Sequence, residues 1–126
     1  MWAIAAETEE QALRLGSSAK MSFLLLRREG RLAPVPPVET ALAYLEREGI
    51  PLDYQGQGRR TILGTPEQVR AQIEQVARDY GAQEVIVVTI THDHAARMHS
   101  YELLAEAFGL GPARGGGAEA ARSAPR

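Results

Sequence analysis

The residues with the most obvious chemistry form one short cluster, His92-Asp93-His94, which directly follows an apolar run. Imidazoles titrate near neutral pH and bind metals, so the cluster could transfer protons, contact a cofactor or chelate a metal. A metal site needs a third ligand, and His99 lies away from His94 on a helix that would begin here. The competing interpretation is structural, with Asp93 capping that helix and both histidines in a solvated loop.

The cluster is positioned by a predicted strand over 84–91. Val85, Ile86, Val87 and Val88 are consecutive, without polar alternation. Such a run is typical of a parallel strand that is covered on both faces. Helical patterns precede and follow it, which indicates an α/β fold with a parallel sheet. Because binding groups gather at the carboxyl ends of such strands, the cluster is the first candidate site.

The helix before this strand is predicted over 66–80. Thr65 can accept the free amides of its first turn, Gln68 completes a capping box, and Gly81 can end it. Pro66 fits the first helical position, where its missing N–H is not needed. The helix after the strand is capped by Asp93 or Thr91 and ends near Phe108. The expected buried stripes are Val69, Ile73, Val76, Ala77 and Tyr80 on the first helix, and Ala95, Met98, Tyr101, Leu104, Ala105 and Phe108 on the second.

The first third of the chain contains a short apolar strand over 2–6 and a long helical pattern over 9–28. Thr8 can cap this helix and Gly30 can close it. Its expected buried stripe is Ala12, Leu15, Ala19, Phe23 and Leu26. The four residues Phe23–Leu26 could instead form a strand, because they are uniformly apolar.

Three less regular segments connect these parts. Residues 32–38 contain three prolines and form a stiff extended spacer. A short helix is expected over 39–48, and the glycine-containing stretch 50–60 is expected to be a loop. Residues 61–63 then lead into the central helix.

Composition limits the classes of protein. The chain has 126 residues, 44% apolar and 24% charged, which is ordinary for one globular domain. A net charge of −2 gives no basic surface for nucleic acid, and the absence of cysteine excludes disulfides and thiolate sites. No run is long enough to span a membrane, so we expect a cytoplasmic protein. The domain is expected over 1–110, followed by a disordered tail rich in Gly, Ala and Arg over 111–126.

Several of these segments, in order and at fitting spacing, resemble the carboxyl-terminal part of luciferase-like flavin-dependent monooxygenases. They are Gly64–Val69, Asp79–Ala82, Val87–Thr89, His92–Arg97 and Ser100–Ala105. Members of that family are (β/α)8 barrels that use reduced flavin mononucleotide (FMN), or a deazaflavin in some branches, with molecular oxygen. The resemblance implies a partial barrel made of the last two βα units, with two parallel strands and flanking helices.

The resemblance also has consequences for assembly and chemistry. Two parallel strands do not make a stable sheet alone, so we expect a homo-oligomer or a chain that supplies the missing strands. Most loops that hold the flavin in the family would be absent, which predicts that the chain is not catalytic alone. His92, Asp93 and His94 remain the candidate cofactor contacts, and the catalytic residues stay unknown. Two alternatives remain open: an active flavin-dependent oxidoreductase completed by a partner, and an oligomeric binding or scaffolding module that uses the His92–His94 loop.

Overall fold

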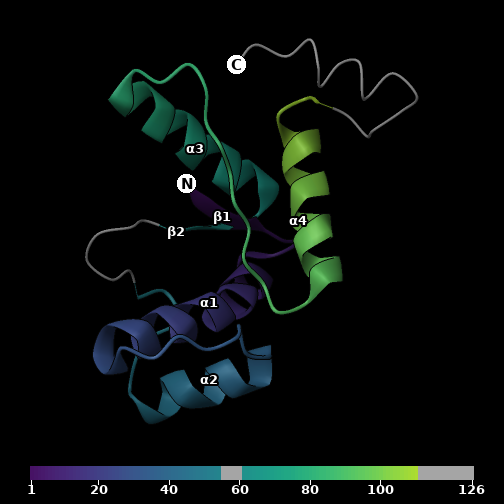
Figure 1. The fold of residues 1–126 in the computed structure, drawn as a ribbon. Coiled ribbons are helices and arrows are strands. Elements are labelled where there is room, and N and C mark those ends of the chain that lie inside the picture. Colours follow the sequence, from purple (N-terminus) through teal and green to yellow (C-terminus); the bar gives the residue numbers. More distant parts are fainter. Residues whose placement is uncertain (55–60, 111–126) are drawn as a thin grey trace.

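The computed structural model describes residues 1–54 and 61–110, and Figure 1 shows how their elements are arranged. The expected tail over 111–126 and the end of the 50–60 loop lie outside the described residues. In chain order the elements are β1 (Trp2–Ala5), α1 (Glu9–Glu29), α2 (Val38–Arg47), β2 (Thr61–Gly64), α3 (Pro66–Tyr80) and α4 (His94–Ala107).

The two strands of the sheet are parallel, but they are a different pair from the one predicted. β1 pairs with β2, with Trp2 opposite Thr61 and Ala5 opposite Gly64. The 84–91 segment lies along the other edge of β1 and forms only an isolated parallel bridge there, between Trp2 and Val88. β1 is therefore central among three extended segments, and β2 is the strand that the sequence pattern missed.

The predicted 84–91 strand is wrong as a full strand because side chains replace its backbone ladder. Thr89 Oγ1 donates to the carbonyl oxygen of Ala3 at 2.8 Å, and Ser100 Oγ accepts the N–H of Ala5 at 2.9 Å. A regular parallel ladder would pair those two backbone groups with the backbone of Ile90. The two hydroxyls satisfy these backbone groups of β1 without continuing the second strand. Backbone pairing therefore stops after the hydrogen bond from the Ala3 N–H to the Val88 carbonyl oxygen, at 3.1 Å.

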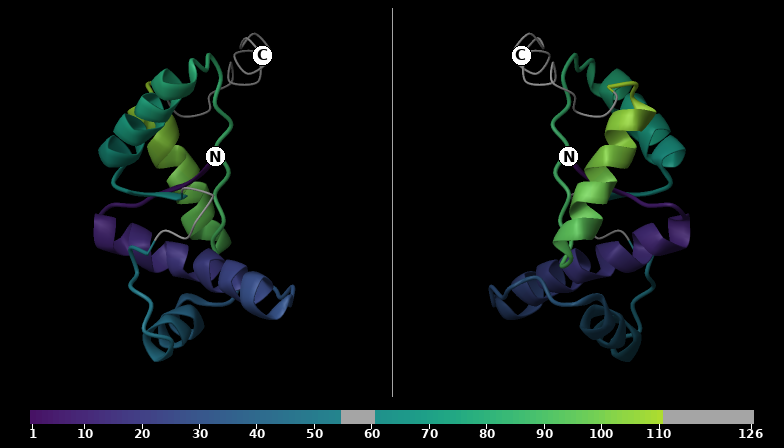
Figure 2. Two further views of the ribbon diagram at one scale, coloured as in Figure 1. Left: turned by 90° about the vertical axis from the view of Figure 1, so that its left-hand side faces the viewer. Right: turned by 90° about the vertical axis from the view of Figure 1, so that its right-hand side faces the viewer.

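Helices cover both faces of this small sheet. Figures 1 and 2 show α3 and α4 on one side of the strands and α1 with α2 on the other. In a (β/α)8 barrel, successive strands are neighbours and the helices cover only the outer face of the sheet. Neither feature is seen in the described residues. Residues 1–54 and 61–110 thus form a mixed α/β arrangement of two parallel strands and four helices, and the partial-barrel expectation is not confirmed.

The main core lies between the sheet and the α3–α4 layer. Its buried members are Ala3, Ala5, Ile62, Val69, Ile73 and Leu104. Val85 and Val87 also pack against this core, whereas Ile86 is 73% exposed and Val88 is 39% exposed. The 84–91 segment is therefore covered on one face only, which corrects the prediction that both faces are buried.

The helix predictions are largely confirmed because their signals are local. Thr65 and Gln68 form the predicted capping box, and Gly30 and Gly81 adopt the left-handed conformation at the ends of α1 and α3. α1 continues through Phe23–Leu26, so the alternative strand there is wrong. No helix in the described part of the chain is long and apolar enough to cross a membrane.

Some predicted core positions are on the surface instead. Tyr80 is 84% exposed at the end of α3, Met98 and Leu26 are over 40% exposed, and Ala95 is also exposed. α4 turns Ser100 and Leu104 inward, and of these two only Leu104 belongs to the predicted apolar stripe. The apolar pattern missed the most buried position of α4 because a serine occupies it.

Candidate functional site

The structure gives the predicted His92-Asp93-His94 cluster mainly structural contacts. Asp93 caps α4, with its Oδ1 accepting the N–H of Ala95 at 3.2 Å. His92 Nδ1 lies 3.1 Å from the carbonyl oxygen of Val35 and so donates to the proline spacer when protonated there. His94 is exposed at the first position of α4. These contacts fix the loop, but they do not bring the two imidazoles to a common ligand.

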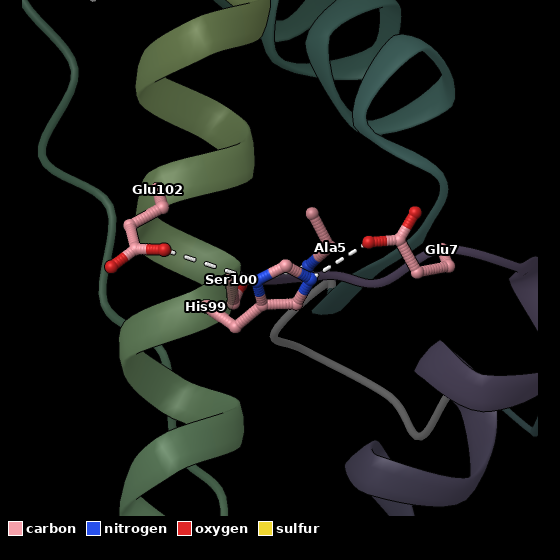
Figure 3. A network of polar contacts seen from close by, with 5 residues as sticks. All are labelled: Ala5, Glu7, His99, Ser100 and Glu102. Carbon is pink, nitrogen blue, oxygen red and sulfur yellow. Dashed lines mark hydrogen bonds and ion pairs between the residues drawn. The ribbon is translucent and has the colours of Figure 1, made fainter. Parts of the chain in front are cut away.

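A second polar network, which the sequence did not single out, lies at the carboxyl end of β1. Figure 3 shows His99 of α4 between two carboxylates. Its Nε2 is 2.8 Å from Glu7 Oε1, and its Nδ1 is 3.9 Å from Glu102 Oε2. Glu7 lies two residues after the end of β1, so the rule that made His92 a candidate would also have drawn attention to Glu7 had it been applied to the first strand.

The His99–Glu7 pair joins the turn after β1 to α4 and lies beside a cavity of about 310 Å³. Gln11 and Arg14 of α1 also line this cavity, as does Val38 at the start of α2. Glu7 orients the imidazole through Nε2, whereas Glu102 approaches Nδ1 only to 3.9 Å, which is beyond hydrogen-bond distance. His99 and Glu7 are, however, about half or more exposed, and solvent screening makes such a pair weak as a structural contact.

Next to this pair, Ser100 and Tyr101 hold the end of the 84–91 segment. Ser100 is fully buried, and the Tyr101 hydroxyl accepts the N–H of Thr89 at 3.0 Å. That backbone hydrogen bond, helped by the nearby Arg97, lowers the pKa of Tyr101 below its ordinary value, and partial burial opposes the shift. The two hydroxyls therefore act chiefly in positioning the sheet edge.

A much larger cavity lies on the opposite face of the sheet. It is an open groove of about 650 Å³ between α1 and the strands, and it borders the exposed side of Val88 and Ile90. Trp2 stacks on Phe23 within it, with ring centroids 4.3 Å apart. The groove falls in the volume range of ligand pockets. It is lined chiefly by apolar side chains, which suit contact with an apolar molecule better than proton transfer.

The described residues contain no cluster of three potential metal ligands, so a metal at His92 and His94 lacks further protein ligands there. The amino ends of the helices are also poor phosphate sites. Asp93 places a carboxylate at the start of α4, where it accepts the Ala95 N–H, and α1 and α3 carry Glu9, Glu10 and Glu67 in their first turns. A phosphate at any of these ends would meet a carboxylate of the same sign.

Comparison with known proteins places this geometry in context. No protein-family model matches the chain. The chain is 34% identical over 111 residues to the uncharacterized Bacillus subtilis protein YwcH, a match that covers 86% of this chain and 32% of YwcH. It is 29% identical over 103 residues to an Escherichia coli protein named luciferase-like monooxygenase, which covers 79% of this chain and 30% of that protein.

Among solved structures, the crystal structure of apo-MsnO8 matches with a TM-score of 0.75 and 32% identity, covering 89% of this chain and 34% of that one. The chain thus spans about one third of the length of the relatives it matches. These similarities support a distant relationship to luciferase-like monooxygenases, in agreement with the resemblance seen in the sequence.

Proposed function

We propose that this chain is the carboxyl-terminal part of a luciferase-like flavin-dependent monooxygenase and does not catalyse alone. The family reaction would be oxidation of a small organic substrate with molecular oxygen and reduced FMN. The observation that carries the proposal is the combination of coverages: the similarity extends over 79% of this chain but only 30% of the relative named for the activity. Much of a complete site would then lie in protein beyond this chain.

The described residues do not fit the flavin phosphate by themselves. FMN carries a dianionic phosphate, whereas the Asp93 carboxylate lies at the start of α4 and acidic side chains lie in the first turns of α1 and α3. The His92–His94 loop offers one exposed imidazole and one that contacts Val35. We therefore propose that flavin binds only when further protein completes the site.

The open sheet edge gives a place for that completion. Val87 has no backbone hydrogen-bond partner among the described residues, and the neighbouring residue Ile86 is 73% exposed. An exposed apolar edge is a template for another strand. A second copy, or a chain that supplies missing strands, would pair along residues 85–87 and cover Ile86.

Flavin titration tests the catalytic part of the proposal. We expect no saturable quenching of FMN fluorescence by the chain alone at micromolar protein, because no phosphate cradle is formed by the described residues. Tight FMN binding by the isolated chain, together with accelerated oxidation of reduced FMN in the presence of a substrate, would overturn the claim that it does not catalyse alone.

Sedimentation tests the assembly part. We expect a dimer or larger oligomer at micromolar concentration, and Ile86→Lys should shift it to monomer because a charge would be desolvated at the interface. Tyr80→Lys is the matched control, since Tyr80 is 84% exposed, against 73% for Ile86, but lies at the end of α3. A folded wild-type monomer, or equal behaviour of the two variants, would contradict pairing at this edge.

The alternative of a binding or scaffolding module centred on the His92–His94 loop has less structural support. Its metal version needs a third ligand, which the described residues do not supply near the loop. Thermal stabilisation across a panel of divalent metals would decide this point. A shift that His94→Ala removes would favour the module, and no shift with any metal would eliminate its metal-binding form.

A further inference from the structure

The proline spacer, residues 32–38, is a part of the chain that the proposed function does not use. Figure 1 shows the connection between α1 and α2 as an extended segment without helix or strand. Pro37 has a φ of −60° and a ψ of 155°, close to the polyproline II conformation. Each proline fixes its own φ in this range and keeps the residue before it extended. The spacer therefore favours a left-handed polyproline helix over other backbone conformations.

One edge of this spacer carries a cation and two prolines. A polyproline II helix has three residues per turn, so Arg31, Pro34 and Pro37 lie above one another along the same edge. All three are exposed, and Leu32 beside them is 86% exposed. The chain thus presents the pattern Arg-x-x-Pro-x-x-Pro on its surface at a fixed spacing.

The spacer is held in place by contacts from other elements. His92 Nδ1 lies 3.1 Å from the carbonyl oxygen of Val35, and the Val35 side chain is half-buried. The Pro37 carbonyl oxygen accepts the N–H of Ala41 at 3.1 Å, which ties the end of the spacer to α2. A partner would therefore meet a segment whose conformation is already set, and would lose less entropy on binding than with a flexible linker.

Arg31 adds a positive charge just before the prolines. Among the described residues its guanidinium has no carboxylate partner, whereas Arg28 pairs with Glu48 at 3.1 Å. A guanidinium can hold a carboxylate through two parallel N–H bonds, so it favours an acidic partner surface. The matching surface would combine an apolar groove for the prolines with an acidic pocket at one end.

We propose that the proline spacer and Arg31 form a docking site for a protein domain of the SH3 class, which binds polyproline helices in a groove lined by aromatic side chains. The dipeptides Ala33-Pro34 and Pro36-Pro37 would occupy the groove, and the Arg31 guanidinium would pair with a carboxylate beside it. The cation precedes the prolines in the chain, which fixes the direction of binding. The proposal is independent of the flavin assignment and of the predicted strand pairing.

Isothermal titration calorimetry with the intact chain tests this docking. One probe is a purified SH3 domain that binds peptides of the form Arg-x-x-Pro-x-x-Pro, and the other is a WW domain, whose aromatic groove reads prolines. We expect saturable binding of the SH3 domain, at least about fivefold tighter than that of the WW domain, because one charge-assisted contact contributes on that scale. The intact chain should bind the SH3 domain at least as tightly as a free peptide of residues 29–39 does, since its spacer is already ordered.

Variants separate the charge from the prolines. Arg31→Met should reduce affinity for the SH3 domain about fivefold and leave affinity for the WW domain unchanged. Pro34→Ala should weaken binding of both domains, because it removes a ring from the groove and loosens the polyproline helix. Arg14→Met on α1 and Pro51→Ala beyond α2 are the matched controls, since both residues are exposed and lie outside the spacer, and they should bind as the wild type does. Circular dichroism of each variant checks that the fold is retained.

Three results would overturn the proposal. They are no saturable binding of the SH3 domain, binding of the free peptide but not of the intact chain, and an SH3 affinity that neither Arg31→Met nor Pro34→Ala lowers. Equal affinity for the WW and SH3 domains would assign the spacer to a partner that reads the prolines alone, and would also overturn it.

Discussion

The hydrogen bond from Ala5 N–H to Ser100 Oγ allows a sharp test of how α4 holds the central strand. Both residues are at most 1% exposed, and the donor and acceptor are 2.9 Å apart. Ser100→Ala would leave a buried N–H without its partner, which costs about 1–3 kcal/mol. Alanine regains roughly 0.5 kcal/mol of helix propensity, so the net loss should be about 0.5–2.5 kcal/mol.

Ser18→Ala is a matched control within the same chain. Ser18 is also fully buried in a helix, but its hydroxyl has no hydrogen-bond partner among the described residues. Replacing it removes a buried unsatisfied group and gains the same helix propensity, so we expect no loss and a gain of up to about 2 kcal/mol. The two substitutions have the same chemistry and should move stability in opposite directions.

The assay is urea unfolding followed by Trp2 fluorescence and circular dichroism at one fixed protein concentration. Amide hydrogen exchange adds a local readout, because the Ala5 N–H should exchange faster in Ser100→Ala and unchanged in Ser18→Ala. Equal unfolding midpoints for the two variants, with unaltered Ala5 protection, would refute the idea that Ser100 replaces the missing part of the ladder.

Three further predictions concern the fold. Tyr101 should ionise below its ordinary pKa of 10.0, as measured by ultraviolet titration. Because folding lowers this pKa, the ionised hydroxyl stabilises the fold above pH 10, and this stabilisation is lost as the pH falls through the pKa of the folded protein. Titration at the ordinary pKa would contradict the Thr89 hydrogen bond. Gly16→Ala should raise the free energy of unfolding by up to about 1 kcal/mol, as measured by thermal unfolding, because alanine favours a helix more than glycine does. The Leu63 methyl that the new Cβ would meet at 2.9 Å can move into the groove, and a clear loss of stability would show that Leu63 is fixed. Thr65→Ala should cost about 1 kcal/mol by removing the α3 cap, and Thr65→Ser should retain most of it; equal losses would argue against capping.

The parts of the fold that were predictable depend on neighbouring residues. Thr65 with Gln68 begins α3, Gly81 ends it, and each acts within one helical turn. Residues 84–91 were not predictable in the same way, although their apolar run is typical of a strand. Their pairing is decided by Ser100 and Tyr101, which approach only after α4 has folded against the sheet.

In the candidate site, too, local features were predictable and long-range contacts were not. Asp93 was predicted as a cap and is one, because capping is local. His99 was set aside because it lies off the face of His94, yet its partner Glu7 is 92 residues away in sequence. No spacing rule connects such a pair. The cofactor contacts proposed for His92, Asp93 and His94 stay a prediction.

The central position of β1 has a consequence for folding. Its partners lie far along the chain: Ala5 is opposite Gly64, Met1 meets Ile86, and Ala5 meets Ser100 across 95 residues. Long-range contacts of this kind slow folding, because a large loop must close before they form. Until α4 has docked, the apolar side chains of β1 lack the cover of Leu104 and stay open to association with other chains.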